Sequence, residues 1–261
     1  MTTDFEIREL HGFNETAALI ALEERIWGVG EGMNRDLLTA MIHTGSLAAG
    51  VFTTEGEMVA LLLAFPTRDA SIQHSHGMGV LEPYRSFGLG AKLKWFQRAW
   101  CLERGINTVQ WTYDPLRAAN AKLNLHKLGV SVGTYYENYY GAMRGINEGA
   151  PSDRFLAAWD LNSAGVLARL EDAETRIIAG AAPTNTVIES KPIEIHLNLE
   201  QAQITFEIPE DFPAMQRKNA TLAIEWREHS RTVFNHYFAR GYRITDFDAS
   251  HSRYLLERTV I

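Results

Sequence analysis

The chain has 261 residues, of which 46% are hydrophobic and 22% charged, and its formal net charge is −7. This composition is typical of a globular protein with one large domain or two modest ones. The negative charge and the lack of clustered Lys and Arg argue against nucleic acid as a general partner. Cys101 is the only cysteine, so no disulfide can form within the chain, and this usage fits a reducing compartment.

Neither a membrane span nor a metal site is predicted. The longest apolar run, MVALLLAF (58–65), is far shorter than the about 18 residues that a spanning helix needs. The N-terminal MTTDFEIREL lacks the basic and apolar regions of a signal peptide, so we expect a cytoplasmic protein with no membrane partner. The sequence has no spaced set of His, Asp or Glu ligands for zinc, and His74 and His76 alone are too few to hold the ion.

The first part of the chain predicts alternating helices and strands. Asn14 is the expected cap of a helix over 15–27, and SLAAGVFT and MVALLLAF, separated by TEGE, predict a hairpin. The order indicates a mixed α/β fold with one parallel crossover. The other expected elements are helices over 35–42, 88–104 and 114–129, and strands over 71–80, 107–113 and 130–141.

The turn-rich GINEGAPSDR (145–154) suggests a boundary between a domain over 1–150 and a C-terminal α/β extension over 151–261. In the extension, IEIHLNL and QITFEIP predict a hairpin, followed by one or two helices and two closing strands. VFNHYFARGYRITDF (233–247) has the helix–Gly–strand rhythm of LNLHKLGVSVGTYY. The extension is therefore either a partial repeat or another α/β connection.

Two glycines, Gly88 and Gly90, stand where an amphipathic helix begins, in YRSFGLGAKL (84–93). Unpaired N–H groups and the helix dipole make such a start an anion site, and glycine lets a phosphate approach the backbone. Arg85 can place a guanidinium on the same phosphate. The alternative is a plain tight turn. A dinucleotide fingerprint is disfavoured because Leu93 stands where a third glycine is needed.

The residues Arg85-Ser86-Phe87-Gly88-Leu89-Gly90 match the R/Q-x-x-G-x-G/A motif, and here the chain resembles the GNAT superfamily of Gcn5-related, acyl-CoA-dependent N-acyltransferases. VLEPY (80–84) is similar to the family's lead-in to this motif, and KLGV (127–130) to the K-L-G-F end of its next helix. The resemblance covers about residues 4–145 and points to a little-characterised bacterial branch with a C-terminal extension. It implies a central mixed sheet flanked by helices.

The resemblance also implies acetyl-CoA or another acyl-CoA, such as succinyl-CoA, as co-substrate. Strand 71–80 would splay from strand 107–113, and the pantetheine arm would lie in the gap, bonded to the backbone near Met78 and Val80. The pyrophosphate would lie on the backbone N–H groups of Phe87, Gly88, Leu89, Gly90 and Ala91, with Arg85 assisting.

The candidate base is a histidine. In the histone acetyltransferase branch a glutamate on the strand before the phosphate loop is the base, and the corresponding position here is His74. His76 shares that face of an extended strand. Either ring could act, because histidine titrates near neutral pH, and a structural role for both is the alternative.

The candidate acid is harder to place. Many family members carry a tyrosine where this chain has Leu125. Asn120 and Asn124 lie four apart on one predicted helical face and could orient the substrate or the thioester. Four tyrosines could bring a phenol from the next strand, but none is assigned as the acid: Tyr135, Tyr136, Tyr139 and Tyr140.

The sequence thus predicts an N-acyltransferase that moves an acyl group to a primary amine of a small metabolite, with amino acids among the candidates. The alternative is a GNAT-fold module that binds CoA or a partner without chemistry, and the missing tyrosine is its best support. Three roles are open for the C-terminal extension: completing the sheet, capping the acceptor site or forming a homodimer surface.

Overall fold

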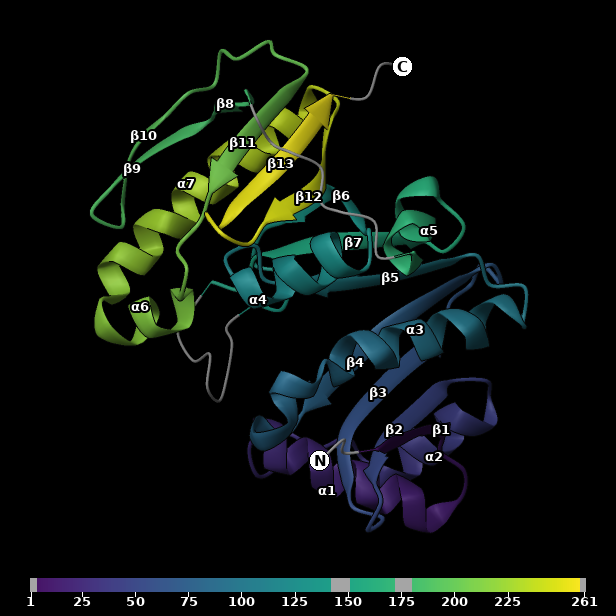
Figure 1. Cartoon of the computed structure of the whole chain (residues 1–261). Helices are drawn as coiled ribbons and strands as arrows, with labels where there is room; N and C mark the ends of the chain where they lie inside the picture. Colours follow the sequence, from purple (N-terminus) through teal and green to yellow (C-terminus); the bar gives the residue numbers. More distant parts are fainter. Residues whose placement is uncertain (1–3, 142–150, 172–179, 259–261) are drawn as a thin grey trace. The chain divides into compact units, whose positions relative to one another are not determined.

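The computed structural model describes residues 4–141, 151–171 and 180–258. It contains two compact units that divide between Trp111 and Thr112 (Figure 1). Residues 145–150 of the expected turn-rich join lie outside the described residues, and the domain boundary expected near 150 stays a prediction. None of the described helices combines the length and the apolar character needed to cross a membrane.

The N-terminal unit is a mixed sheet in the order β1-β2-β3-β4-β5, in which only β4 and β5 run parallel. This confirms the predicted hairpin and the parallel crossover. Its strands are β1 (Phe5–Glu9), β2 (Leu47–Thr53), β3 (Met58–Pro66), β4 (Ile72–Val80) and β5 (Thr108–Tyr113). Its helices are α1 (Phe13–Trp27), α2 (Arg35–His43), the 3₁₀ helix η1 (Glu82–Phe87) and α3 (Leu89–Leu102).

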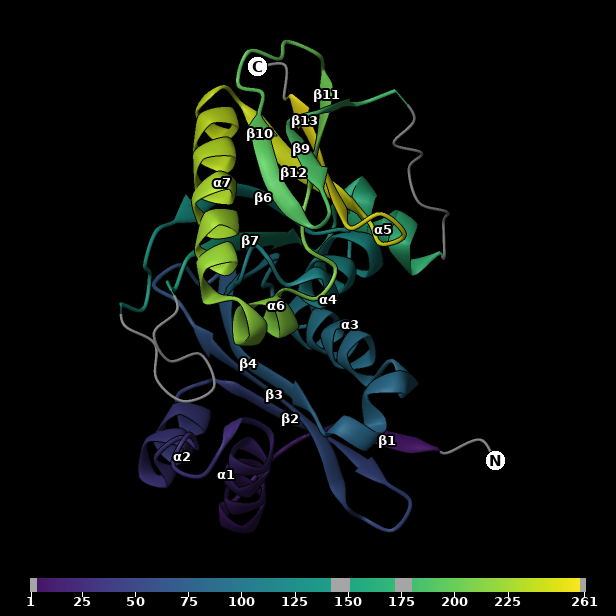
Figure 2. The same ribbon diagram turned by 90° about the vertical axis from the view of Figure 1, so that its left-hand side faces the viewer.

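The two sheet faces of this unit carry different helices. Figure 2 shows α1 and α2 on one side of β2, β3 and β4, and α3 on the other side. Helix α1 begins at Phe13 after Gly12, so the prediction that Asn14 caps it is wrong. Asn14 lies inside the first turn of α1. The second helix does have an Asn cap, because the Asn34 side chain accepts a hydrogen bond from the Leu37 N–H at 3.1 Å.

A β-bulge in β4 changes which residues face which helix. In the pairing of β4 with β3, Ala64 lies opposite Ser75 and Leu63 opposite Gly77, which leaves His76 as the extra residue. Side chains alternate between the two faces of a strand, so one extra residue reverses the alternation that follows.

The contacts of β4 on either side of the bulge show this reversal. Before the bulge, Ser75 faces α3 and accepts a hydrogen bond from Lys94. After the bulge, Gly79 faces α1, where a Cβ added to it would lie 2.8 Å from Ile26 Cδ1 and 3.1 Å from Trp27 Cζ2. Glycine at this position therefore lets α1 pack directly on the strand backbone.

Replacing Gly79 by Val should destabilise the N-terminal unit by about 1–3 kcal/mol, because the side chain would be forced into Ile26 and Trp27. Urea unfolding of the purified variant measures this loss. Gly77→Ala is the matched control, since its Cβ would meet Trp27 only at an ordinary 3.7 Å. Equal stability of Gly79→Val and the wild type would show that α1 is not held against β4 as described.

The C-terminal unit contains a second sheet region in the order β7-β6-β12-β13-β11-β8 and a separate β10-β9 pair. Only β11 and β8 are parallel in the described pairings of this region. Its strands are β6 (Ser131–Tyr136), β7 (Arg154–Asp160), β8 (Ala182–Pro183), β9 (Asn185–Ile188), β10 (Lys191–Ile195), β11 (Gln203–Glu207), β12 (Tyr242–Asp248) and β13 (Arg253–Arg258). Its helices are α4 (Ala118–Ala121), the π-helix η2 (Lys122–Lys127), α5 (Ala164–Leu170), α6 (Phe212–Lys218) and α7 (Ala220–Ala239).

The order of these strands supports the interpretation of the extension as a partial repeat. Helix η2 is followed by Gly129, at φ 69°, and the antiparallel pair β6 and β7. Helix α7 is likewise followed by Gly241, at φ 84°, and the antiparallel pair β12 and β13. Because β6 pairs with β12, the order β7-β6-β12-β13 places the two copies back to back.

Three predictions for this unit are wrong. The strand expected over 130–141 ends at Tyr136, and residues 137–140 form turns. The segments IEIHLNL and QITFEIP do not form a hairpin, because β10 pairs with β9 whereas β11 pairs with β13 and β8. The helix expected from Asp114 begins only at Ala118. The Asp114 carboxylate accepts a hydrogen bond from the Leu116 N–H at 2.9 Å and holds a distant arginine, so it shapes a turn instead of capping a helix.

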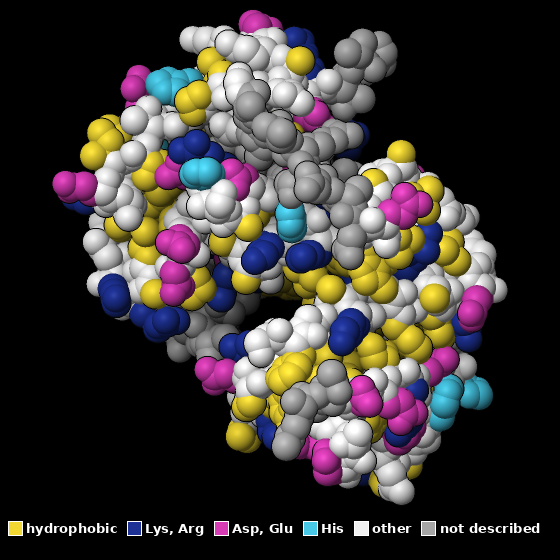
Figure 3. All heavy atoms as spheres, in the orientation of Figure 1, with side chains coloured by type: hydrophobic (Ala, Val, Ile, Leu, Met, Phe, Trp, Pro, Cys, Tyr) yellow, Lys and Arg dark blue, Asp and Glu magenta, His cyan; other side chains and the backbone are white. Residues whose placement is uncertain are grey.

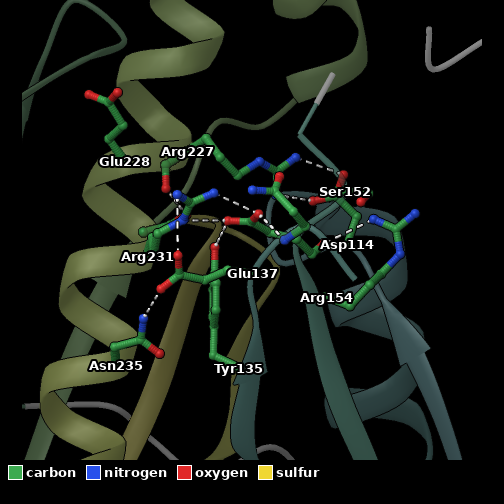
Figure 4. Close-up of polar contacts among 12 residues, drawn as sticks. Asp114, Tyr135, Glu137, Ser152, Arg154, Arg227, Glu228, Arg231 and Asn235 are labelled. Atoms are coloured by element: carbon green, nitrogen blue, oxygen red, sulfur yellow. Dashed lines mark hydrogen bonds and ion pairs between the residues drawn. The ribbon is translucent and has the colours of Figure 1, made fainter. Parts of the chain in front are cut away.

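A network of ion pairs with largely buried carboxylates joins α7 to segments that flank the strands (Figure 4). Both terminal nitrogens of Arg227 donate to the Asp114 carboxylate, at 2.7 and 2.9 Å. One turn further along α7, Arg231 donates to both oxygens of Asp153, at 3.0 and 2.8 Å. Asp153 also accepts the Tyr135 hydroxyl at 2.6 Å, and its side chain is fully buried. Burial opposes its ionisation, but the hydrogen bonds from Arg231 and Tyr135 outweigh this and hold the Asp153 pKa below its usual value.

Replacing Asp153 by Ala should lower the free energy of unfolding by about 3 kcal/mol, because Arg231 and the Tyr135 hydroxyl lose their acceptor. Chemical denaturation at neutral pH measures the loss. Since the folded pKa is lowered, the contribution of Asp153 is present above its unfolded pKa and disappears as acid takes the pH through the folded value. The gap between variant and wild type should therefore close in acid. Glu137→Gln, which removes a half-exposed partner of Arg231, is the control and should cost under about 1 kcal/mol.

Candidate functional site

The glycine-led start of α3 has the geometry of an anion site. The 3₁₀ helix η1 ends at Phe87, Gly88 adopts the left-handed conformation at φ 69°, and α3 begins at Leu89. The carbonyl of Gly88 accepts hydrogen bonds from the Ala91 and Lys92 N–H groups at 3.1 and 3.2 Å, so the N–H groups ahead of them have no acceptor one turn back in the helix. A Cβ built on Gly88 meets nothing within 4 Å, so the loop is open to an approaching group. These features fit a phosphate.

Arg85 lies beside this loop. Its Nε donates to the carbonyl of Val80 at 3.3 Å, and the side chain is exposed. The contact ties the guanidinium to the end of β4 and leaves its terminal nitrogens available next to the helix start. The sequence motif therefore places a cation and a set of backbone donors at one end of β4.

The parallel strands β4 and β5 stop pairing partway along their length. Their described pairs end at His74 opposite Gln110, although β4 continues to Val80 and β5 to Tyr113. On its other edge β4 stays paired with β3 as far as Val80. The expected splay of the two strands is thus present, and Met78 and Val80 lie in the unpaired stretch of β4.

Both candidate histidines lie at the start of this stretch, on the α1 face of β4. His74 is the last residue paired with β5, and its partner on β3 is Phe65. The His76 ring stacks on the Phe65 ring at a centroid distance of 4.9 Å. His74 lies opposite Phe65 and His76 stacks on the same ring, so both imidazoles lie on one side of β4.

Both histidines favour the neutral form. Burial lowers the pKa of His74, and the nearby His76 and Lys94 lower it further. Burial also lowers the pKa of His76. At neutral pH each ring can therefore accept a proton.

The loop after α1 is held by two carboxylates. Glu23, which is 4% exposed, accepts a hydrogen bond from the Met33 N–H at 2.9 Å, and Glu24 accepts one from the Gly30 N–H at 3.1 Å. Burial raises the pKa of Glu23. Together they fix the loop that follows Trp27, the residue whose ring covers Gly77 and Gly79.

A buried polar group on the opposite face of β4 was missed by the sequence reasoning. Lys94, Gln97 and Cys101 stand at helical spacing on α3, and they contact Gln73 and Ser75 of β4. The signal was present, because a Lys and a Gln interrupt an otherwise apolar helix face. Burial raises the pKa of the Cys101 thiol to about 12, so this cysteine is no nucleophile at neutral pH.

The remaining candidates belong to the C-terminal unit. Asn120 is exposed on α4, whereas Asn124 is only 4% exposed and follows the change to π-helical geometry, so the two amides have different surroundings. Leu125, at the position of the absent tyrosine, is fully buried. The Tyr135 hydroxyl donates to Asp153, and burial raises its pKa, so it is engaged in the ion-pair network.

The face seen in Figure 3 carries acidic and basic side chains interspersed with apolar ones. Within the described ranges, no three His, Cys, Asp or Glu side chains are arranged to hold a metal ion.

Two solved structures show what this chain is similar to. The ribosomal-protein-S18-alanine N-acetyltransferase from Escherichia coli is 20% identical, with a TM-score of 0.50, over 62% of this chain and 96% of that protein. An acetyltransferase of the GNAT family from Streptococcus pneumoniae is 17% identical, also with a TM-score of 0.50, over 59% of this chain and 98% of that protein. No protein-family model matches the sequence, and no curated protein matches it. The likeness shows that this chain has the GNAT fold, with further residues beyond it.

Proposed function

We propose that this protein is an acyl-CoA-dependent N-acyltransferase. It moves an acetyl group, or a larger acyl group such as succinyl, to the primary amine of a small metabolite, with amino acids as the first candidates. The observation that carries the proposal is the end of β4–β5 pairing at His74, followed along the chain by the glycine-led start of α3. The GNAT fold and the acetyltransferase names of its structural neighbours support it.

The residues present fit an acyl-CoA. The N–H groups from Phe87 to Gly90 and the Arg85 guanidinium would hold the pyrophosphate, since they combine backbone donors, a helix start and a cation. The Ala91 N–H, expected among these donors, is instead bonded to the Gly88 carbonyl at 3.1 Å. The edge of β4 that faces β5 at Met78 and Val80 has no described strand partner there and would hold the pantetheine arm, while the other edge stays paired with β3. A bound acyl-CoA supplies an acyl group activated as a thioester.

The chain itself provides the base. An amine attacks only in its neutral form and loses a proton as the new C–N bond forms, and a neutral imidazole can accept that proton. His74 is the first candidate of the two histidines, because it stands where the resemblance places the base and is the last residue of β4 that pairs with β5. No side chain is assigned to protonate the departing thiolate, since the usual tyrosine is Leu125 here and a thiolate is a good leaving group.

A thiol-release assay tests the activity. The purified protein is mixed with acetyl-CoA or succinyl-CoA and a panel of primary amines that includes amino acids, and free CoA thiol is measured. Thiol release that needs both partners is expected. Tight CoA binding without release for any pair would instead support the alternative, a non-catalytic CoA-binding module. The cytoplasmic location and a homodimer stay predictions.

Replacing Gly88 by Val should weaken CoA binding at least about tenfold, because a branched side chain would stand over the backbone donors. Isothermal titration calorimetry with CoA measures this. Gly105→Val is the matched control, because Gly105 follows the other end of α3 with φ 74° and equally open space. Both variants carry the same backbone strain, so only the effect on CoA separates them. Unchanged affinity in folded Gly88→Val would rule out this phosphate loop.

Replacing His74 by Gln should lower kcat/KM about 100-fold or more if His74 is the base, and His76→Gln should have a smaller effect. The wild-type pH profile gives an independent check. Because the His74 pKa is lowered from 6.5, the neutral base persists in mild acid, and the acid limb of kcat at saturating amine, which reports the bound complex, should lie below that value. A larger loss in His76→Gln would exchange the two roles.

A further inference from the structure

Lys94 is a buried lysine whose ammonium has no carboxylate partner in the described part of the chain. It is 2% exposed on α3, and its Nζ donates to Ser75 Oγ at 2.8 Å and to Gln97 Oε1 at 3.1 Å. On the remaining side, Nζ lies 3.8 Å from the centroid of the Trp111 ring. The ammonium is therefore satisfied by two neutral acceptors and an aromatic face.

A buried lysine without a carboxylate partner costs folding free energy, which a purely structural role does not explain. Burying a charge without a counter-charge disfavours the charged form, and burial lowers the pKa of Lys94 to about 7. A methionine or leucine of similar length would fill the same space between α3 and β4 without that cost. The charge therefore needs a reason beyond packing.

The position of Lys94 relative to β4 supplies the reason. Ser75, which accepts its hydrogen bond, lies between His74 and His76, and its side chain points to the face opposite the two rings. Lys94 thus places an ammonium behind the strand at the level of the candidate base.

The other groups around the pair are neutral or apolar. Gln73 and Ser75 face Lys94 from β4, Trp111 from β5, and Gln97 and Cys101 from α3 itself. His74 faces Phe65 of β3 and is influenced by His76 on its own strand.

We propose that Lys94 is a positioning residue for His74, whose charge holds the imidazole in the neutral form that can accept a proton from the acceptor amine. This role rests on the proposed function in so far as His74 is its base. As the pH falls toward neutrality, Lys94 takes up a proton before His74 does. The resulting charge then opposes a second proton on the nearby ring. The hydrogen bond to Ser75 fixes the strand beside the bulge at the same time.

The test measures the titration of His74 directly. In the free protein with ¹³C-labelled histidine, the imidazole signals are followed by NMR against pH for the wild type, Lys94→Met and Lys94→Gln. Lys94→Gln keeps a polar group that can bond to Ser75 and Gln97. It therefore allows the test even if Lys94→Met does not fold. We expect both folded variants to raise the His74 midpoint, by roughly half a pH unit.

Two controls separate this effect from general changes. Lys92→Met removes a charge from an exposed position of the same helix and should leave His74 unchanged. His43, exposed on α2, serves as the internal reference signal. An unchanged His74 midpoint in folded Lys94→Gln would overturn the proposal.

This readout needs no substrate, so its outcome is separate from that of the proposed function. A raised His74 midpoint without any thiol release would support Lys94 as the residue that controls the protonation of the imidazole. The same result would argue against acyl transfer. If the protein is active, the acid limb of kcat at saturating amine should move upward with the midpoint in Lys94→Gln. A lower rate with an unmoved limb would mean that Lys94 only supports the strand.

Discussion

The extra residue in β4 is the constraint on which the rest of the N-terminal unit depends. His76 has no partner in the register of β3. Odd-numbered residues of β4 therefore point to one face of the sheet before His76 and to the other face after it. Gln73 and Ser75 therefore meet the polar side of α3, whereas Gly77 and Gly79 lie under the end of α1. A regular strand would place all four on one face. The bulge lies two residues beyond the end of β4–β5 pairing at His74, so the sheet opens beside the two histidines, which lie on the α1 face.

The polarity of the α3 face follows from the same arrangement. Because the sheet opens beside it, the contact between α3 and β4 is not a simple apolar layer. Gln97 bonds both Gln73 and Lys94, and Cys101 donates to Gln73 at 3.2 Å. The Nε2 of Gln73 is buried without a partner among the described residues, but the other hydrogen bonds of the network hold α3 and β4 in one relative position. This rigidity helps to keep the backbone of β4 apart from that of β5 beyond the point where their pairing ends.

Sequence reasoning recovered the elements whose signals are local. The match of Arg85 to Gly90 with a known motif, and the glycine in front of α3, predicted the helix start and the splayed strands. What it missed depends on partners far apart in the chain. The bulge at His76 is defined only by pairing with β3. Asp114-Pro115 predicts a helix start because the sequence does not show that Asp114 binds Arg227, more than a hundred residues away. The false hairpin has the same cause, since strand patterns show that strands exist but not which of them pair.

The Lys94 cluster is an intermediate case. Its residues recur at helical spacing on an apolar face, which marks them as unusual, but only the structure shows that they meet β4 behind His74. The C-terminal unit is similar in this respect. The repeated helix–Gly–strand pattern can be recognised in the sequence, but only the structure shows that the strands of the two copies, β6 and β12, pair with each other.

The most direct test of the account is to map CoA onto the chain by backbone amide NMR. Uniformly ¹⁵N-labelled, deuterated protein is titrated with CoA, and the shift of each assigned amide is followed. The account predicts saturable changes centred on the amides of Phe87 to Ala91 and of Met78 to Val80, where the helix start and the unpaired strand lie. Saturable binding with its largest changes elsewhere, or no binding at all, would contradict it.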